Sequence, residues 1–313
     1  MNKKGKILIT DSLFIFREHE KMLCDVGYEV ERLDKPDSTE NELIQAVKGK
    51  VGYILGGIEK ITDKVIDAAD ELKAIAFTGA DWRNFIPGHV QATARGISIA
   101  STPGANTYAV AEYTVTIILA MTRNIFELGR TGEKKFQTVH SLNELTVGVV
   151  GMGHIGTRVT KILIALGVKK ILYYSRTRKP DIERDGVEFV DMETLLQNSD
   201  IVTLHASKEV GADFIGRNEL SKMKDSALLV NCGFTGGVNV EALFQELKTG
   251  RIRAAQDDPM GDDRFGTLPL SVWFNSNSHT AFNTFEANKI ASDMSTESLI
   301  NLLSVGMDQY KVN

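Results

Sequence analysis

V-G-V-V-G-M-G-H-I-G, residues 147–156, is the stretch that decides the fold of this chain. Its first four residues are small or β-branched and favour a buried parallel strand, and Gly151, Gly153 and Gly156 follow with G-x-G-x-x-G spacing. Gly151 would permit a tight turn, Gly153 would let a pyrophosphate approach the backbone, and Gly156 would let the next helix pack closely. The first amides of that helix would then face the phosphates, so the stretch predicts a dinucleotide site.

The same glycine spacing also occurs in purely structural turns, and the context decides between the two interpretations. An apolar-periodic helix follows over residues 155–166, Gly167 closes it, and a second strand is expected at 171–174. Strand, glycine turn, helix and strand in this order favour the nucleotide site. The residues expected to contact the dinucleotide here are Gly151, Gly153, His154, Ile155 and Gly156.

The composition of the 313-residue chain, 42% hydrophobic and 25% charged, is that of a globular protein large enough for two domains. The formal net charge of -5, without any basic run, argues against nucleic acid or an anionic membrane surface as a partner. Cys24 and Cys232 lie far apart and outside any Cys/His cluster, so neither a disulfide framework nor a metal site is expected. No apolar run is long enough to span a membrane, and we expect a cytoplasmic location.

Strand and helix patterns alternate along the whole chain. Strands are expected at residues 6–10, 28–33, 51–55, 74–77, 97–100, 147–150, 171–174, 187–190, 200–205, 227–231 and 252–256. Helices are expected at residues 14–26, 40–48, 63–69, 106–124, 155–166, 192–198, 218–223, 240–249 and from 284 onward. This alternation predicts an α/β fold with two doubly wound, Rossmann-like domains, each a parallel sheet covered by helices on both faces. The helix at 106–124 is apolar on so many sides that it needs two partners, either the two domains or a second subunit.

Five segments carry a resemblance to a known family: A-V-A-E-Y-T-V (109–115), G-M-G-H-I-G (151–156), S-D-I-V-T-L-H (199–205), M-K-D-S-A-L-L-V-N (223–231) and S-H-T-A-F-N-T (278–284). In this order they resemble the D-isomer-specific 2-hydroxyacid dehydrogenases, which include glyoxylate and hydroxypyruvate reductases and D-lactate dehydrogenases. The resemblance implies a flavodoxin-like substrate domain at 1–102 plus 284–313, an inserted NAD(P)-binding Rossmann domain at 103–283, and an active site in the cleft between them. It also implies a homodimer through the nucleotide-binding domain and the 106–124 helix.

The resemblance places the acid/base residue of the reaction at His279, because a histidine can give and take a proton near neutral pH. His205 is expected to line the nicotinamide pocket, whereas His19, His89 and His140 are expected at the surface.

The family pairs its histidine with a carboxylate that fixes the tautomer. Asp263 falls at that position in this sequence. Asp262 and Asp258 are the alternatives, and a plain acidic, solvated loop is the remaining interpretation.

The chain departs from the family at the arginine that grips the substrate carboxylate, because that position is occupied by Phe234. A lost bidentate contact would cost several kcal/mol of transition-state binding, roughly a hundredfold or more in rate. Arg83 and Arg264 are the candidate replacements, although each also fits a plain surface charge. Backbone amides at Gly56 and Gly57 match the family's carboxylate-binding loop.

Phe234 and Trp82 together predict a more apolar pocket and a bulkier substrate than the family norm.

The turn after the second strand of the nucleotide domain predicts the cofactor. NAD-preferring domains end this strand with an acid, but here it ends at Ser175, followed by Arg176, Thr177 and Arg178. A hydroxyl with guanidinium groups suits a 2′-phosphate, so NADP(H) is preferred and NAD(H) remains possible. Further cofactor contacts are expected from His205, Cys232 and Asp258.

The sequence therefore predicts an NAD(P)H-dependent oxidoreductase that reduces a 2-oxo acid to a D-2-hydroxy acid, or runs in reverse. Two alternatives stay open. One is a reductase for an atypical carbonyl substrate in specialised biosynthesis. The other is a catalytically weakened NADP(H)-binding sensor that resembles a co-repressor.

Overall fold

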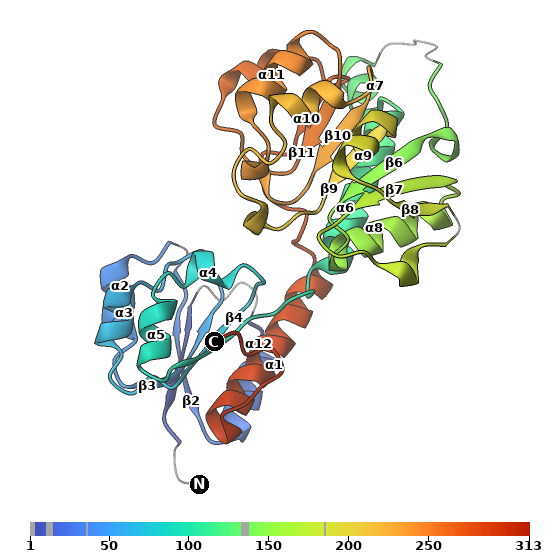
Figure 1. Ribbon diagram of the computed structural model, residues 1–313. Helices are drawn as coiled ribbons and strands as arrows, with labels where there is room; N and C mark the ends of the chain where they lie inside the picture. The colour runs from blue at the N-terminus through green and yellow to red at the C-terminus, as the bar shows by residue number, and fades with distance from the viewer. Residues whose placement is uncertain (1–3, 11–14, 36, 133–137, 185) are drawn as a thin grey trace. The chain divides into compact units, whose positions relative to one another are not determined.

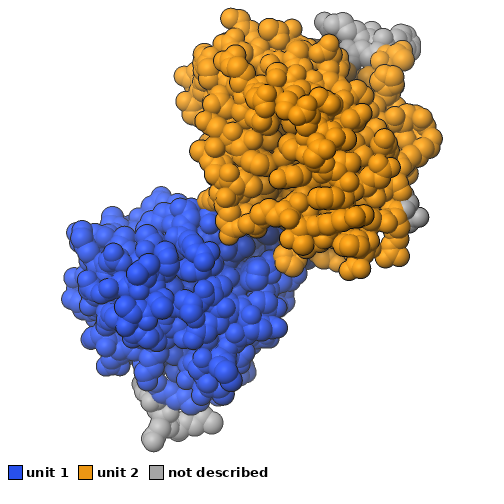
Figure 2. Space-filling model, in the orientation of Figure 1, with its two compact units in different colours: residues 1–106, 284–313 blue, residues 107–283 orange. Residues whose placement is uncertain are grey.

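The computed structural model describes residues 4–10, 15–35, 37–132, 138–184 and 186–313. The chain divides into two compact units, a first unit of residues 1–106 with 284–313 and a second unit of residues 107–283 (Figure 1, Figure 2). Each unit is built on a parallel sheet between layers of helices, which confirms the predicted fold class. The predicted helix start at Phe14 lies outside the described residues.

The sheet of the first unit has five parallel strands in the order β2-β1-β3-β4-β5. Its strands are β1 (Lys6–Thr10), β2 (Glu29–Leu33), β3 (Lys50–Leu55), β4 (Ala74–Phe77) and β5 (Ser98–Ala100). Its helices are α1 (Arg17–Asp25), α2 (Glu40–Ala46), α3 (Asp63–Ala68), α4 (Trp82–Phe85), α5 (His89–Ala94) and α12 (Phe285–Val305).

Side-chain alternation along β1 sorts the core of the first unit into two layers. Ile7 and Ile9 pack in the layer of α1 and α12, whereas Leu8 packs in the layer of α2 and α3. Figure 1 shows the same division, with α2, α3 and α5 on one face of the sheet and α1 and α12 on the other.

The sheet of the second unit has seven parallel strands in the order β12-β11-β10-β9-β6-β7-β8. Its strands are β6 (Thr146–Val150), β7 (Lys170–Tyr174), β8 (Val187–Phe189), β9 (Ile201–Leu204), β10 (Leu228–Asn231), β11 (Arg253–Gln256) and β12 (Trp273–Asn275). Its helices are α6 (Thr107–Thr122), α7 (Ile125–Thr131), α8 (His154–Ala165), α9 (Met192–Asn198), α10 (Arg217–Lys222) and α11 (Val240–Lys248). The strand order reverses between β6 and β9, and ligands of doubly wound sheets bind beyond the carboxyl ends of the strands at this point.

Among the α-helices and strands of the described residues, α4, α5, α7 and β12 were not predicted. The helix α4 has four residues, about one turn, which is too few for a helical period to emerge from the sequence. Within the described ranges, no helix has both the length and the apolar character that crossing a bilayer needs.

Candidate active site

The loop between β6 and α8 gives each of its three glycines a separate physical role. Gly151 has φ +97°, and a Cβ there would lie 2.5 Å from the carbonyl oxygen of His205. A Cβ on Gly156 would lie 2.0 Å from the oxygen of Gly151, whereas a Cβ on Gly153 would meet nothing within 4 Å. Gly151 and Gly156 are therefore needed for packing, and Gly153 leaves open space beside the first turn of α8. These features fit a dinucleotide pyrophosphate.

A hollow beyond the carboxyl ends of β6, β7 and β9 adjoins this loop. It brings together six of the residues predicted to bind the cofactor: Gly151, Gly153, Ser175, Arg176, Thr177 and His205. Lys179, which the sequence interpretation did not single out, lines the same hollow. His154 lines an adjoining hollow with Lys161, Lys179 and Arg184. Ile155, Gly156, Cys232 and Asp258 are not among the lining residues of either hollow.

The basic turn after β7 is bound to carboxylates. The guanidinium of Arg176 lies 2.8 Å from a carboxylate oxygen of Glu209. Arg178 donates to both oxygens of Glu183, and this pairing, together with the Tyr173 hydroxyl, lowers the pKa of Glu183 to about 2. Arg178 is therefore occupied within the fold, and Arg176 is the arginine that lines the hollow.

His205 contributes a neutral ring to the hollow. Desolvation lowers its pKa to about 4, and its Nε2 lies 3.0 Å from the hydroxyl of Thr203. At neutral pH the ring is uncharged, so it forms part of the wall of the hollow and does not act there as a cation.

Cys232, which was predicted to contact the cofactor, is buried and lines neither of the two hollows. Its side chain is 8% exposed and packs in the hydrophobic core that includes Val110 and Ala111 of α6. Burial raises the pKa of the thiol to about 12. At neutral pH the side chain is therefore a protonated thiol that packs in this core.

The carboxylate that the structure places beside His279 is that of Asp258, which was one of the alternatives to Asp263. Asp258 Oδ1 lies 3.3 Å from His279 Nδ1. Asp263 begins an exposed 3-10 turn (Asp263–Thr267), which belongs to a different part of the same segment. The side chain of His279 is 60% exposed and that of Asp258 is 30% exposed, so the ring is accessible to a ligand.

Asp257 fixes the loop that carries His279, and the sequence interpretation missed it. It is 4% exposed, and its carboxyl oxygens accept hydrogen bonds from the Ser276 hydroxyl at 2.5 Å and the Ala281 amide at 2.6 Å. Between these two contacts, Asn277 has φ 56° and His279 has φ 46°. Its position could have indicated a role in the site, because Asp257 follows directly after a buried strand.

The loop after β10 places Phe234 against apolar side chains. The amide of buried Asn231 donates to the Phe234 carbonyl at 3.2 Å, and this bond shapes the loop. Phe234 lines a small hollow with Leu204, Ala206, Val210, Phe214, Asn231 and Gly237. An apolar wall is therefore present at the position where the family resemblance implies an arginine.

Three of the side chains and amides expected to contact the substrate have partners within the fold. Of the two glycines expected to bind an anion, Gly56 donates its amide to the Thr10 carbonyl at 3.2 Å. Trp82 is 6% exposed and belongs to the core, with Arg83 stacked over its ring at 4.4 Å. Arg264, a candidate replacement for the missing arginine, is bound by two carboxylates, those of Asp262 and Glu241.

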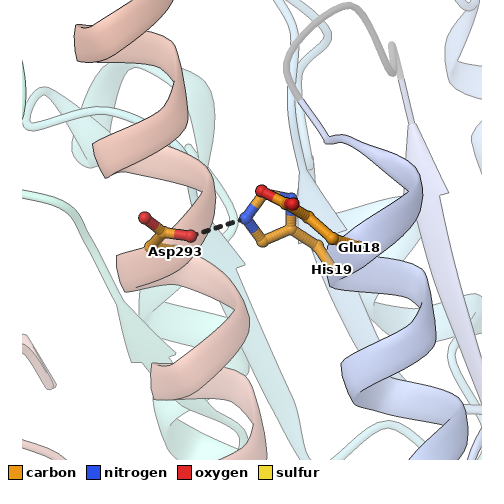
Figure 3. A group of neighbouring side chains, drawn as sticks. All are labelled: Glu18, His19 and Asp293. Carbon is orange, nitrogen blue, oxygen red and sulfur yellow. Dashed lines mark hydrogen bonds and ion pairs between the residues drawn. The ribbon is translucent and has the colours of Figure 1, made fainter.

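His19 is fully buried, although it was expected at the surface. Its Nδ1 accepts the Phe16 amide at 3.2 Å, so Nε2 carries the proton and donates to Asp293 of α12 at 2.8 Å (Figure 3). Glu18, His19 and Asp293 lie close enough for a metal site. The Lys289 ammonium already lies 2.9 Å from Glu18 and 3.0 Å from Asp293. The cluster is therefore an ion-pair network that joins α1 to α12.

Comparison with known proteins agrees with this geometry. Residues 115–269 match the family model described as "D-isomer specific 2-hydroxyacid dehydrogenase, NAD binding domain". A glyoxylate reductase of Thermofilum pendens is 37% identical over 310 residues, which cover 94% of this chain and 89% of the relative. A D-3-phosphoglycerate dehydrogenase of Methanocaldococcus jannaschii is 32% identical over 98% of this chain, which spans only 59% of that longer protein. The crystal structure of the TT0316 protein from Thermus thermophilus superposes with a TM-score of 0.85 at 28% identity, covering 98% of this chain and 100% of that one.

The chain therefore belongs to the D-isomer specific 2-hydroxyacid dehydrogenase family. It is an oxidoreductase that uses a nicotinamide dinucleotide to act on a CH–OH group or the corresponding carbonyl.

Proposed function

We propose that this protein reduces a 2-oxo acid to the D-2-hydroxy acid, with His279 as the proton donor. When bound, the nicotinamide supplies the hydride to the carbonyl carbon. His279 would deliver the proton to the carbonyl oxygen from Nε2, while Asp258 holds Nδ1 and stabilises the ring orientation. The observation that supports this most strongly is the 3.3 Å approach of Asp258 to an accessible His279, on the unit that carries the dinucleotide loop. The first unit would supply the substrate domain.

The test is NADPH oxidation with glyoxylate, hydroxypyruvate, pyruvate and bulkier 2-oxo acids. Asp258→Asn should lower kcat at least tenfold, because the ring loses its orienting carboxylate, and Asp263→Asn is the matched control that should leave kcat unchanged. A loss of kcat in Asp263→Asn alone would instead assign the pairing with His279 to Asp263. A wild-type protein that binds NADPH yet turns over no 2-oxo acid would refute the proposed function.

The cofactor preference that we propose is NADPH over NADH. Ser175 stands where an acid would repel a 2′-phosphate, and Arg176 and Lys179 line the adjoining hollow. A bound 2′-phosphate would compete with Glu209 for the Arg176 guanidinium. Ser175→Asp should therefore weaken NADPH binding at least tenfold and leave NADH binding nearly unchanged, as measured by cofactor fluorescence. Equal affinities of the wild type for the two cofactors would contradict the preference.

We also propose that a homodimer forms through the second unit and α6. The helix is apolar, and Tyr108 (63% exposed), Leu119 (36%) and the nearby Ile125 (55%) remain at the surface of the single chain. Light scattering after gel filtration should give the mass of a dimer, and Leu119→Glu should shift it toward the monomer. A monomeric wild type would contradict this arrangement.

Phe234 favours a second candidate, a reductase for a carbonyl compound without a carboxylate. The hollow beside Phe234 is lined mainly by apolar side chains, which suit such a substrate. Turnover of ketones or aldehydes at higher kcat/KM than their 2-oxo acid counterparts would support it.

A further inference from the structure

The helix α6 packs against the loop that carries His279. Tyr113 of this helix is half-buried and packs against the hydrophobic core that contains Ala281, a residue of that loop. Phe282 packs against the same core, and its ring centroid lies 5.3 Å from that of His279. The helix and the loop therefore share one region of the core of the second unit.

The hydroxyl of Tyr113 joins the polar group that fixes this loop. It forms side-chain hydrogen bonds with Asp257 and Ser276. The Ser276 hydroxyl itself donates to Asp257 at 2.5 Å, and the Ala281 amide donates to the other oxygen of the same carboxylate at 2.6 Å. Donors from both the loop and α6 therefore meet at the buried Asp257 carboxylate.

The Tyr113 hydroxyl carries its proton at neutral pH. Burial, together with the negative charge of Asp257, raises the pKa of Tyr113 to about 12. A protonated phenol donates to a carboxylate, so α6 supplies Asp257 with a hydrogen bond that persists across the neutral pH range. Since the ring is packed against the core, the hydroxyl is held in place from the helix side.

The position of the His279 ring depends on these contacts. Asn277 and His279 have φ of 56° and 46°, and left-handed conformations of non-glycine residues persist only where the surroundings hold them. Ser276 and Ala281 flank this strained segment on its two sides, and both are bound by Asp257. A misplacement of a catalytic group by about 1 Å can cost roughly a hundredfold in rate. A group that restrains Asp257 and Ser276 therefore also restrains the proton donor.

We propose that Tyr113 is a positioning residue for the reduction, and that it acts through Asp257 and Ser276 to hold the ring of His279 in place. The inference rests on the proposed reduction of a 2-oxo acid with His279 as the proton donor, and it gives α6 a part in that step. Loss of the hydroxyl should lower kcat and leave the binding of substrate and cofactor unchanged.

The kinetic test compares Tyr113→Phe, which removes the hydroxyl and keeps the ring, with Thr116→Val. The hydroxyl of Thr116 is exposed, lies about one turn further along α6 and donates to the Glu112 carbonyl at 2.9 Å. With a 2-oxo acid that the wild type accepts, Tyr113→Phe should lower kcat at least about fivefold, while KM and the Kd for NADPH stay within about twofold. Thr116→Val should leave all three unchanged. An unchanged kcat in Tyr113→Phe would overturn the proposal, even if the variant unfolds at a lower urea concentration, as would an equal loss in Thr116→Val.

A double-mutant cycle tests whether Tyr113 acts through Asp257. In Asp257→Ala the carboxylate that receives the phenol is gone, so addition of Tyr113→Phe should lower kcat by no more than about twofold further. Losses of kcat that multiply in the double variant would show that the two residues act independently and would overturn the proposal.

The position of the ring is read separately from turnover. With ¹³C-labelled histidine, the six histidines of the chain give ring signals in NMR spectra, and the signal that is absent from His279→Asn belongs to His279. In Tyr113→Phe this signal should move toward its position in Asp258→Asn, because the ring leaves its carboxylate partner, and in Thr116→Val it should stay in place. An unmoved signal in Tyr113→Phe would overturn the assignment. Absence of wild-type turnover would refute the proposed function instead, and the ring signal would still decide whether Tyr113 holds the loop.

Discussion

Substitution of Asp257 by alanine is the sharpest structural prediction, because one buried carboxyl group holds the whole loop of His279. The group accepts hydrogen bonds from Ser276 and from the Ala281 amide, at 2.5 and 2.6 Å. Alanine would leave both donors without this acceptor, and each buried unsatisfied donor costs about 1–3 kcal/mol. We expect Asp257→Ala to lower the free energy of unfolding of the second unit by about 2–4 kcal/mol.

The same substitution should also impair catalysis. His279 has φ 46°, a left-handed conformation that costs a non-glycine residue about 1–2 kcal/mol and has to be held by its surroundings. Without Asp257 the loop can relax and move the imidazole, so kcat should fall at least tenfold. Asp257→Asn keeps an oxygen for the Ala281 amide and should lose less than half as much stability.

The two tryptophans allow each unit to be followed separately, because Trp82 lies in the first unit and Trp273 in the second. In a Trp82→Phe background, urea unfolding monitored by Trp273 fluorescence reports on the second unit alone. Unfolding of Asp257→Ala at the same urea concentration as its parent, or retention of full kcat, would show that Asp257 does not hold this loop.

Three further predictions concern the cofactor loop, the thiols and pH. Gly153→Ala should leave the unfolding free energy unchanged yet weaken NADPH binding. Gly156→Ala should destabilise the second unit, since its Cβ would lie 2.0 Å from a backbone oxygen. Thermal unfolding and cofactor titration of both variants check these expectations. In the native protein a thiol reagent should modify exposed Cys24 and leave Cys232 unmodified until urea unfolds the chain, and rapid labelling of both would contradict the burial. The folded pKa of His205, about 4, lies below its usual value near 6.5, so the unfolded chain binds more protons between these values and stability falls as pH drops through this window. The loss should reach about 1–3 kcal/mol near pH 4 and be smaller in His205→Gln; a pH profile identical in the two proteins would rule this out.

Most of the fold followed from local patterns. The glycine motif and the alternating periodicities located the strands, because each buried strand and amphipathic helix is encoded within its own residues. The roles expected of Gly151, Gly153 and Gly156 agree with the space around each of them. The three-residue edge strand β12 was missed.

The sequence could not predict the side-chain contacts of the site, because they depend on loop conformation and on residues distant in sequence. Counting along an acidic segment favoured Asp263, but the left-handed backbone at Asn277 and His279 turns the ring toward Asp258. His19 is buried against α12, where its hydrogen-bond partner Asp293 lies 274 residues further along the chain. No local pattern reports such a pairing.

The most direct test of the central claim is a comparison of wild type and His279→Asn in NADPH-dependent reduction of a 2-oxo acid that the wild type accepts. Asparagine tolerates the left-handed backbone but cannot donate the proton as a histidine does, so the loop should stay folded. We predict NADPH oxidation by the wild type, and a rate at least about a hundredfold lower for His279→Asn at unchanged NADPH affinity. Equal rates for the two proteins would contradict it.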